Sequence, residues 1–404
     1  MEEYSVISIE LTNKLSKIIK KNNGIFFTPP SCVNNNLNLL KPYIKNIINV
    51  LEPSCGSCEY ITSLHKLFPH LIITGIEYNE IIYQSILQLN NDKINIKNID
   101  YLKYETHEKY DLIIGNPPYI VIKKEDVDKS YYTYFDGRPN IFILFIIKSM
   151  KMLNNDGILS FILPKNFLNC LYYDKTRKYI AQNFKILNII ECNDKYIETQ
   201  QDTILFIIQK TSIFNNNTFI FENNIYTIFV TEENNIKMKN LYKNSKTLLE
   251  LGFKVSVGNV VWNQCKDLLT DDITKTRLIY SSDIENNMLI KKKYNNDDKK
   301  NFINKKGLNH PMIVVNRGYG VGKYKFNYFL INNEINEYLI ENHLICIEYK
   351  NVLPYDKLIT LYNNILLSLN DKRTIEFITN YFGNNAINTT ELNNILPIYQ
   401  DIEI

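Results

Sequence analysis

The chain up to Lys210 predicts an α/β fold, a mostly parallel β-sheet with helices on both faces. Short, continuous apolar runs alternate there with segments long enough for helices, and small or acidic residues follow several of these runs. Strands buried on both faces have continuous apolar sequences, and the helices between them connect parallel neighbours. The expected strands are Ile47–Leu51, Leu71–Ile76, Ile94–Ile96, Leu112–Ile114, Gly157–Leu163, Ile186–Ile190 and Thr203–Ile208. Ligands of such sheets bind beyond the carboxyl ends of the strands.

The rest of the chain divides into an N-terminal extension and a second domain. Apolar residues at helical spacing predict one helix over residues 9–21, which GIFFTPPS (24–31) ends because Gly and Pro interrupt helices. SIFNNN (212–217) is typical of a linker, and the polar run at 291–306 is typical of an exposed loop. We therefore expect a helical extension (1–23), an α/β domain (24–212) and a C-terminal mixed α+β domain (217–404).

The composition is that of a globular protein, because 45% of the 404 residues are apolar and 22% are charged. The net charge of +3 is too small to identify a polyanion as the partner. The 7 cysteines are odd in number and scattered, which favours reduced thiols in the cytoplasm. The N-terminus lacks an apolar signal segment, and the apolar stretch Ile141–Ile147 is far shorter than the ~20 residues that span a membrane. We therefore expect a soluble protein without membrane contact, located in the cytoplasm or, if a virus encodes it, in the interior of the host cell.

A turn of small residues follows the first expected strand, from Glu52 to Cys58, and leads into a helix. Such a turn lets the backbone approach a ligand closely, as in nucleotide-binding loops. It is not a Walker loop, because no Gly-Lys-Ser/Thr follows. An ordinary strand-to-helix turn is one alternative, and a redox-active pair formed by Cys55 and Cys58 is another.

Acidic residues also follow the second and third expected strands. Glu77 ends the second strand roughly 25 residues after the loop, where related folds place the carboxylate that binds ribose hydroxyls. Asp100 and Tyr101 follow the third strand, and a carboxylate beside an aromatic ring suits an adenine ring with its amino group. Together with the loop, these positions predict a nucleotide-like ligand at one edge of the sheet.

The most specific motif is Asn116-Pro117-Pro118-Tyr119, which directly follows a buried strand. The two prolines fix φ and remove two N–H donors, so carbonyl groups and the Asn amide remain to face a ligand. Such a turn can accept two hydrogen bonds from one NH₂ group, and the tyrosine ring can stack on a planar group. A plain surface turn is the alternative, but this tetrapeptide is unusual directly after an apolar strand.

With this motif the chain resembles the γ-class (TaqI-type) DNA adenine-N6 methyltransferases, which use S-adenosylmethionine (SAM). Further similar segments are GIFFTPP, residues 50–60, GRPNIFILFIIKSMKML (137–153) and DGILSFILPKNFL (156–168). The resemblance implies a Rossmann-like SAM-dependent methyltransferase domain, and its loop usually has glycine where this chain has Cys58. The cofactor-binding residues that it implies are Thr28, Pro29, Glu52, Pro53, Ser54, Cys55, Gly56, Glu77, Tyr78, Asp100, Tyr101, Asn116 and Pro118.

The resemblance also implies the reaction, transfer of the SAM methyl group to N6 of an adenine flipped out of double-stranded DNA. S-adenosylhomocysteine would be the product, and no metal is expected, since the histidines do not cluster with cysteines. The Asn116 side-chain oxygen and the Pro117 carbonyl would accept the two N6 hydrogens. Tyr119, together with Tyr196 in DKYIETQQDTILFIIQK (194–210), would hold the flipped base by aromatic contact.

The C-terminal domain resembles the target-recognition domain of this class in residues 251–269 and 380–398. Arg and Lys side chains suit guanine edges and Asn suits adenine, although each can equally contact phosphate or nothing. The expected DNA-binding residues are Trp262, Asn263, Lys266, Arg317 and Lys323. The resemblance implies a monomer that acts on double-stranded DNA, and a separate cognate restriction endonuclease as its partner is a hypothesis that the sequence does not test.

Other functions use the same tetrapeptide. It also resembles the motif of methyltransferases that modify glutamine in release factors, and that of some RNA guanine-N2 enzymes. Those proteins are usually shorter and carry their extra domain at the N-terminus, whereas here a long segment follows the catalytic domain. A catalytically silent nucleic-acid-binding homologue is a third possibility, which SAM binding would distinguish.

Overall fold

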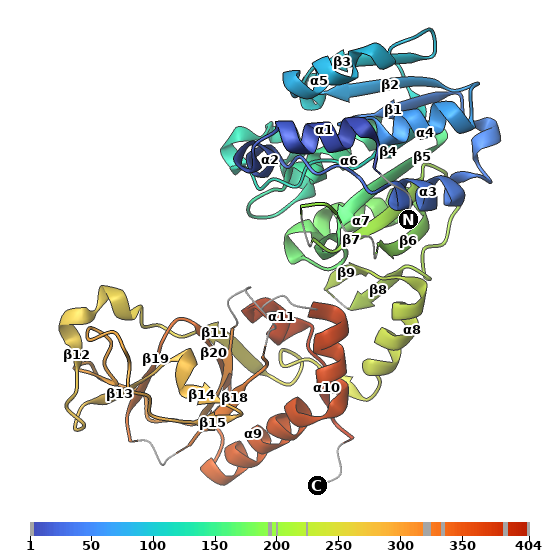
Figure 1. Cartoon of the computed structure of the whole chain (residues 1–404). Coiled ribbons are helices and arrows are strands. Elements are labelled where there is room, and N and C mark those ends of the chain that lie inside the picture. Colours follow the sequence, from blue (N-terminus) through green and yellow to red (C-terminus); the bar gives the residue numbers. More distant parts are fainter. Residues whose placement is uncertain are drawn as a thin grey trace. The chain divides into compact units, whose positions relative to one another are not determined.

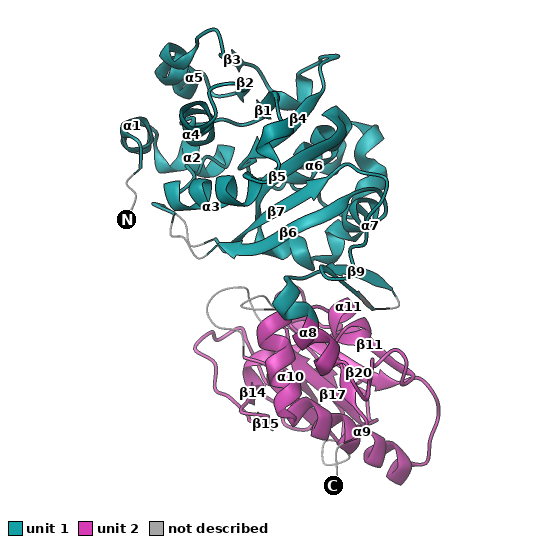
Figure 2. Cartoon of the chain, turned by 90° about the vertical axis from the view of Figure 1, so that its right-hand side faces the viewer, with its two compact units in different colours: residues 1–235 teal, residues 236–404 magenta. Residues whose placement is uncertain are grey.

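The computed structural model describes residues 4–192, 196–198, 201–223, 225–317, 325–332, 336–382 and 387–401. The chain forms two compact units, residues 1–235 and 236–404 (Figure 2). The first unit therefore extends beyond the linker at 212–217 and includes the hairpin of β8 (Ile220–Asn223) and β9 (Tyr226–Phe229). The domain boundaries inferred from the sequence stay predictions.

A seven-stranded sheet forms the centre of the first unit (Figure 1). Its strands are β1 (Asn49–Glu52), β2 (Ile72–Glu77), β3 (Ile94–Asn98), β4 (Tyr110–Gly115), β5 (Leu153–Pro164), β6 (Lys185–Cys192) and β7 (Thr203–Gln209). Their order is β3-β2-β1-β4-β5-β7-β6, and β7 runs antiparallel to both of its neighbours. The predicted α/β fold with a mostly parallel sheet is confirmed. The strand order reverses between β1 and β4, which is where sheets of this kind bind ligands.

Apolar side chains form one core on each face of this sheet. Along β5, Leu159 and Phe161 contribute to one core, whereas Ile158 and Ile162 contribute to the other. The first face is covered by α6 (Ile141–Met152) and α7 (Asp174–Asn183). The second face is covered by α1 (Val6–Lys14), α3 (Pro30–Leu40), α4 (Glu59–Leu67) and α5 (Glu80–Ile86). Burial on both faces explains why the strand sequences are continuous apolar runs.

The N-terminal extension consists of two helices, so the single helix predicted over residues 9–21 is wrong. The side chain of Ser16 caps a second helix, α2 (Lys17–Asn23), by accepting a hydrogen bond from the Ile19 amide. Serine is favoured at helix N-termini because its side-chain oxygen accepts a hydrogen bond from a free backbone amide. Here this capping starts a new helix, although the apolar spacing continues across Ser16. The helix ends at Gly24, whose left-handed conformation (φ 62°) favours glycine.

The second unit has mixed α+β structure, as predicted. Its two larger sheets have the orders β11-β20-β17-β18 and β12-β16-β13-β19, and α8 (Glu232–Leu241) crosses the boundary between the units. Its strands are β10 (Ser245–Lys246), β11 (Phe253–Val257), β12 (Leu269–Thr270), β13 (Thr276–Ile279), β14 (Ile284–Glu285), β15 (Met288–Leu289), β16 (Phe302–Ile303), β17 (Met312–Asn316), β18 (Tyr328–Ile331), β19 (Tyr338–Ile340), β20 (Leu344–Tyr349) and β21 (Ile398–Tyr399). Its remaining α-helices are α9 (Tyr355–Asn370), α10 (Lys372–Phe377) and α11 (Thr389–Asn394).

The segment 291–306, predicted to be an exposed loop, is only partly so. Phe302 and Ile303 form the buried strand β16, which pairs with β12 and β13. Two apolar residues were enough to pair with neighbouring strands in an otherwise polar run. Over the residues that the structure describes, no helix is long and apolar enough to cross a membrane.

Candidate functional site

A cavity of about 340 Å³ opens in the first unit where β1, β2 and β4 end. Nine of the expected cofactor-binding residues line it, together with residues of the Gly24 segment and of α6. Those nine are Pro53, Ser54, Gly56, Glu77, Tyr78, Asp100, Tyr101, Asn116 and Pro118. Its size is within the range of small-molecule sites.

The small-residue loop forms the first wall of the cavity, and the end of β2 fixes its shape. The Cys55 amide donates to the Ile76 carbonyl at 2.9 Å, and the Gly56 amide donates to the Glu77 carboxylate at 2.9 Å. Cys58 is fully buried and has φ 64°, a left-handed conformation that favours glycine. The chain therefore keeps a glycine-type turn here although the residue is cysteine.

Glu77 is the acidic centre of the cavity. Its carboxylate also accepts from the Asn79 amide at 2.7 Å, and it is almost entirely buried. Burial raises the pKa of Glu77 to about 7, although its hydrogen bonds to backbone amides oppose this shift. A buried carboxylate in a cleft is suited to accept hydrogen bonds from hydroxyl groups of a ligand.

The third strand contributes a mixed wall. Asp100 caps a short helical turn by accepting from the Leu102 amide at 2.9 Å. Tyr101 is buried and its ring packs on Phe145 of α6, with the ring centroids 4.8 Å apart. The apolar part of the cavity comes instead from residues that the sequence analysis did not single out, and these are Ile25, Ile82, Ile99, Ile120, Ile141 and Phe145. The signal available was the apolar run at 141–147, which the sequence analysis used only to exclude a membrane span.

Asn116 lies at the end of β4 with its side chain held in one orientation. The amide nitrogen Nδ2 donates to the Phe26 carbonyl at 3.4 Å and to Thr28 Oγ1 at 3.3 Å. These two acceptors direct Oδ1 to the opposite side of the amide, where it can accept hydrogen bonds. The Ser54 hydroxyl donates to the Asn116 carbonyl at 3.2 Å, which joins the small-residue loop to this turn.

Tyr119 packs beneath the turn with its hydroxyl directed inward. The hydroxyl lies 2.8 Å from Asn116 Oδ1 and 3.0 Å from the Ile162 carbonyl, so its single proton can serve either acceptor. Burial, with a further effect of the nearby Tyr196, raises the pKa of Tyr119 well above its ordinary value, so the phenol stays neutral. The ring contacts Phe142 edge-on, and the residue as a whole is half-buried.

The other expected residues lie behind the cavity wall rather than on it. Thr28 and Pro29 are buried beside Asn116, Pro117 is buried within its turn, and Tyr196 is only 8% exposed. Glu52 and Cys55 are also buried. Burial raises the pKa of Glu52, and its Oε2 atom has no hydrogen-bond partner in the described part of the chain.

The expected DNA-binding residues of the second unit lie on its surface, and some of their charge is already compensated. Asn263, Lys266 and Arg317 are exposed, whereas Trp262 is half-buried. Lys266 forms a 2.7 Å ion pair with Asp298. Lys323 lies outside the described residues.

Trp262 belongs to a cluster of rings around a lysine of the 291–306 segment. The Lys299 ammonium lies 4.1 and 4.3 Å from the ring centroids of Tyr280 and Tyr294, and 5.9 Å from that of Trp262. Burial lowers the pKa of Lys299, and the cation–π contacts offset part of its desolvation. This cluster anchors the segment against the short helical turn at Trp262.

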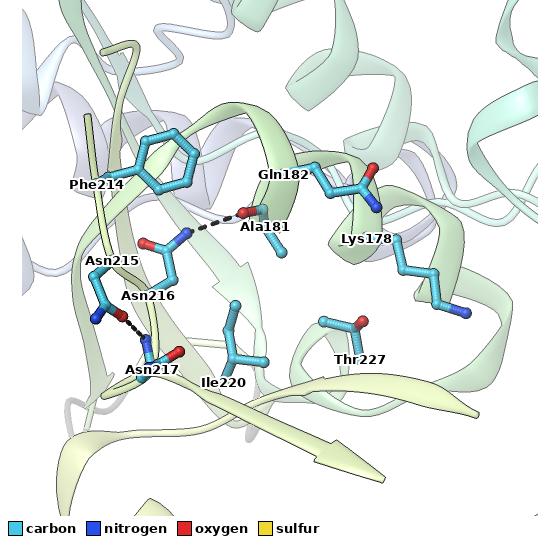
Figure 3. A pocket seen from close by; sticks show the side chains of 9 residues that line it. All are labelled: Lys178, Ala181, Gln182, Phe214, Asn215, Asn216, Asn217, Ile220 and Thr227. Atoms are coloured by element: carbon cyan, nitrogen blue, oxygen red, sulfur yellow. Dashed lines mark hydrogen bonds between the residues drawn. The ribbon is translucent and has the colours of Figure 1, made fainter. Parts of the chain in front are cut away.

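A second cavity in the first unit, of about 410 Å³, is larger but has no comparable chemistry (Figure 3). It is lined by Lys178, Ala181, Gln182, Phe214, Asn215, Asn216, Asn217, Ile220 and Thr227. Two of its polar side chains serve the fold: the Asn216 amide donates to the Ala181 carbonyl, and Lys178 pairs with Asp174 at 2.8 Å. In the described parts of the chain, no group of His, Cys, Asp and Glu side chains could hold a metal ion.

Comparison with known proteins identifies the class. Residues 59–197 match the family model described as Eco57I restriction-modification methylase. The type II methyltransferase M.CvrRI of Paramecium bursaria Chlorella virus XZ-6E is 27% identical over 86% of this chain and 88% of its own length. The modification methylase CviBIII of Paramecium bursaria Chlorella virus NC1A is 27% identical over 99% of this chain and 100% of its own length.

Two further matches agree with this class. The type II methyltransferase M.HincII of Haemophilus influenzae is 31% identical over 43% of this chain and 34% of its own length. Among solved structures, one described as a DrdV–DNA complex has a TM-score of 0.54 with 12% identity, over 98% of this chain and 57% of that one, which shows the fold alone. With the Asn-Pro-Pro-Tyr turn beside the cavity, these matches show that the chain is a type II DNA methyltransferase of a restriction-modification system, whose residues 59–197 are similar to the Eco57I restriction-modification methylase family.

Proposed function

We propose that this methyltransferase transfers the methyl group of SAM to N6 of an adenine flipped out of double-stranded DNA. The observation that carries the proposal is the fixed orientation of Asn116, whose amide nitrogen is bound by Phe26 and Thr28 so that Oδ1 is available as an acceptor. An NH₂ group on a planar ring is the substrate that such an acceptor suits best. We expect the protein to act as a monomer, with a separate cognate endonuclease.

The residues around the cavity fit SAM. Glu77 supplies a buried carboxylate for ribose hydroxyls, and the wall of Ile82, Ile99 and Phe145 suits an adenine ring. Asp100 lies beside that wall and can accept from the adenine amino group. The unpartnered Oε2 atom of Glu52 is a buried acceptor behind the same loop. SAM supplies the electrophilic sulfonium methyl group, and the roles of these residues are part of the proposal.

The amino nitrogen of adenine is a poor nucleophile, because its lone pair is conjugated into the ring. Asn116 Oδ1 and the Pro117 carbonyl would accept the two N6 hydrogens and so return the lone pair to the nitrogen. The Tyr119 hydroxyl can donate its hydrogen bond to the Ile162 carbonyl instead of to Asn116 Oδ1. Asn116 Oδ1 can then accept a hydrogen bond from the base. Positioning and fixed dipoles would then account for most of the rate enhancement.

The test is to incubate the purified protein with unmethylated DNA and SAM, and to analyse the digested nucleosides by mass spectrometry. We expect N6-methyladenine from the wild type and, since fixed polar contacts of this kind contribute about 100-fold or more, almost none from Asn116→Ala. Both proteins should first be shown to bind SAM by calorimetry.

Two results would contradict the proposal. N4-methylcytosine as the product would keep the DNA methyltransferase and overturn adenine specificity. SAM binding without any methylated nucleoside would redirect the search to RNA and to protein glutamine.

A further inference from the structure

The N-terminal helices contact the catalytic unit at its cofactor loop. At the start of α1, the hydroxyl groups of Ser5 and Ser8 lie 2.6 and 2.5 Å from the Glu59 carboxylate. Ser8 also lies 2.7 Å from the hydroxyl of Ser57, within the loop that lines the cavity. These contacts fix α1 to the turn between β1 and α4.

The second helix carries a lysine in an unusual environment. The side chain of Lys20 is only 4% exposed, and its ammonium group donates to the Thr12 carbonyl and to Glu198 Oε1, both at 2.7 Å. Glu198 is 23% exposed and belongs to the connection between β6 and β7. The ion pair thus joins two segments 178 residues apart in the chain.

Glu198 follows Tyr196 by two positions, and the two residues share one packing environment. Residues 196–198 enclose a cavity of about 10 Å³ together with Thr12, Phe26 and Phe27. That volume is close to the room needed by one water molecule. Tyr196 is therefore held against the N-terminal segment rather than projecting into solvent.

The end of α2 contacts the catalytic turn. A Cβ atom on Gly24 would lie 3.1 Å from Pro118 Cβ and 3.1 Å from the Tyr119 amide nitrogen, so the two backbones are in close contact. Four residues further on, Thr28 accepts the hydrogen bond from the Asn116 amide. The stretch from Lys20 to Thr28 therefore contacts both the catalytic turn and the segment that carries Tyr196.

We propose that Lys20 is a positioning residue for methyl transfer, and that its ion pair with Glu198 sets the location of Tyr196 relative to the Asn116–Tyr119 turn. A buried ion pair is a poor source of net stability, because desolvation of the two charges offsets their attraction. Its best-established use is to define one register between two segments. This inference rests on the proposed function, in which Tyr119 and Tyr196 hold the flipped base.

The first experiment measures this register without requiring catalysis. Hydrogen exchange followed by mass spectrometry is compared between the wild type, Lys20→Met, and the matched control Lys21→Met on the exposed face of α2. We expect faster exchange in peptides that include Tyr196 to Glu198 only in Lys20→Met, while peptides from β1 and β4 remain protected. If exchange near Tyr196 stays unchanged in Lys20→Met, the proposal is overturned even if the enzyme methylates adenine.

The second experiment separates positioning from general destabilisation. On unmethylated DNA, we expect kcat of Lys20→Met to fall about tenfold or more, with KM for SAM little changed, since small displacements of reacting groups cost rates of this order. Because Lys20 acts through Tyr196, the same change made in a Tyr196→Ala background should have no further effect. Additive losses in the double variant would overturn the proposal.

Two milder variants test whether the ion pair itself, rather than the Lys20 side chain alone, positions Tyr196. Glu198→Gln retains an oxygen acceptor for the ammonium group, and it should show the same losses to a smaller degree. Lys20→Arg keeps the charge and should restore part of the rate. If the wild type itself produces no methylated adenine, the proposed function fails, whereas the exchange result still decides whether the ion pair holds Tyr196 in place.

Discussion

In the catalytic unit, the amide of Asn116 is held by Phe26, a residue 90 positions earlier in the chain, and its oxygen is left to accept a hydrogen bond. In the C-terminal unit, the ammonium of Lys266 is already paired with Asp298, and that of Lys299 lies over aromatic rings. The first arrangement leaves a polar oxygen whose donor is the Tyr119 hydroxyl, 2.8 Å away, whereas in the second both ammonium groups already have partners within the unit. The role proposed for Asn116 thus rests on a rigid local arrangement, whereas the DNA contacts proposed for the second unit depend on which charges the fold leaves uncompensated.

After the loss expected for Asn116→Ala, the largest effect should come from removing the Tyr119 ring. Tyr119→Ala deletes a half-buried ring that packs on Phe142 and borders the catalytic turn, so we expect a fall in kcat of about 100-fold. Tyr119→Phe keeps the ring and removes only the hydroxyl beside Asn116 Oδ1, so its loss should be much smaller. Single-turnover methylation of DNA with saturating SAM measures both. Equal losses in the two variants would show that the hydroxyl, and not the ring, is what matters.

The C-terminal unit offers a direct test of charge compensation. Arg317 is exposed at the end of β17, so Arg317→Ala should weaken DNA binding about tenfold and reduce its dependence on salt. Lys266→Ala should change DNA affinity by less than about twofold, because Asp298 already compensates the charge of Lys266 in an exposed ion pair. Fluorescence anisotropy with double-stranded DNA at several salt concentrations measures both. A larger effect of Lys266→Ala would mean that DNA replaces Asp298 as the partner of Lys266. It would then be wrong that paired charges of the second unit do not contribute to DNA binding.

The sheet and most of its cavity could be predicted because each rests on a local pattern. Buried strands are continuous apolar runs, and Glu77, Asp100 and Asn116 each follow one of them, so parallel topology brings them to one edge. The break between α1 and α2 could not be predicted from apolar spacing, because the capping of Ser16 decides it.

Long-range contacts account for what the sequence did not predict. Nothing local indicates that Lys20 pairs with Glu198, or that Ile25 and Phe145 share a cavity wall, because such contacts depend on the completed fold. In the second unit, the pairing of Lys266 and the burial of Phe302 depend equally on tertiary contacts. The type of side chain indicated that Lys266 could contact DNA, but it did not indicate that Asp298 compensates its charge.

The pH dependence of SAM binding tests the acidic centre of the cavity. The pKa of Glu77 is raised to about 7 by burial, so the folded protein binds this proton more tightly than the unfolded chain does. Its contribution to stability is therefore present below the ordinary carboxyl pKa and is lost as the pH rises through 7. If the ionised carboxylate accepts the ribose hydroxyls, SAM affinity should increase several-fold as the pH rises across 7.

Calorimetric titration of SAM at several pH values would detect this increase. Glu77→Gln should bind SAM more weakly and show no such rise, whereas Glu80→Gln on the exposed first turn of α5 should behave as the wild type does. A rise that persists in Glu77→Gln would assign the titration to another group.

The smallest effect concerns the backbone at Cys58, and it is best measured as a difference between two variants. Both Cys58→Gly and Cys58→Ala lose the buried sulfur, but only glycine relieves the left-handed strain at φ 64°. We therefore expect the glycine variant to be more stable than the alanine variant by about 1 kcal/mol.

At Cys32, which is buried inside α3, the order should reverse, because glycine in a helix costs about 1 kcal/mol relative to alanine. Urea unfolding of the four variants measures both differences, and SAM binding should survive in Cys58→Gly. An alanine variant at Cys58 as stable as the glycine variant, or more stable, would show that the turn does not require a glycine-type backbone.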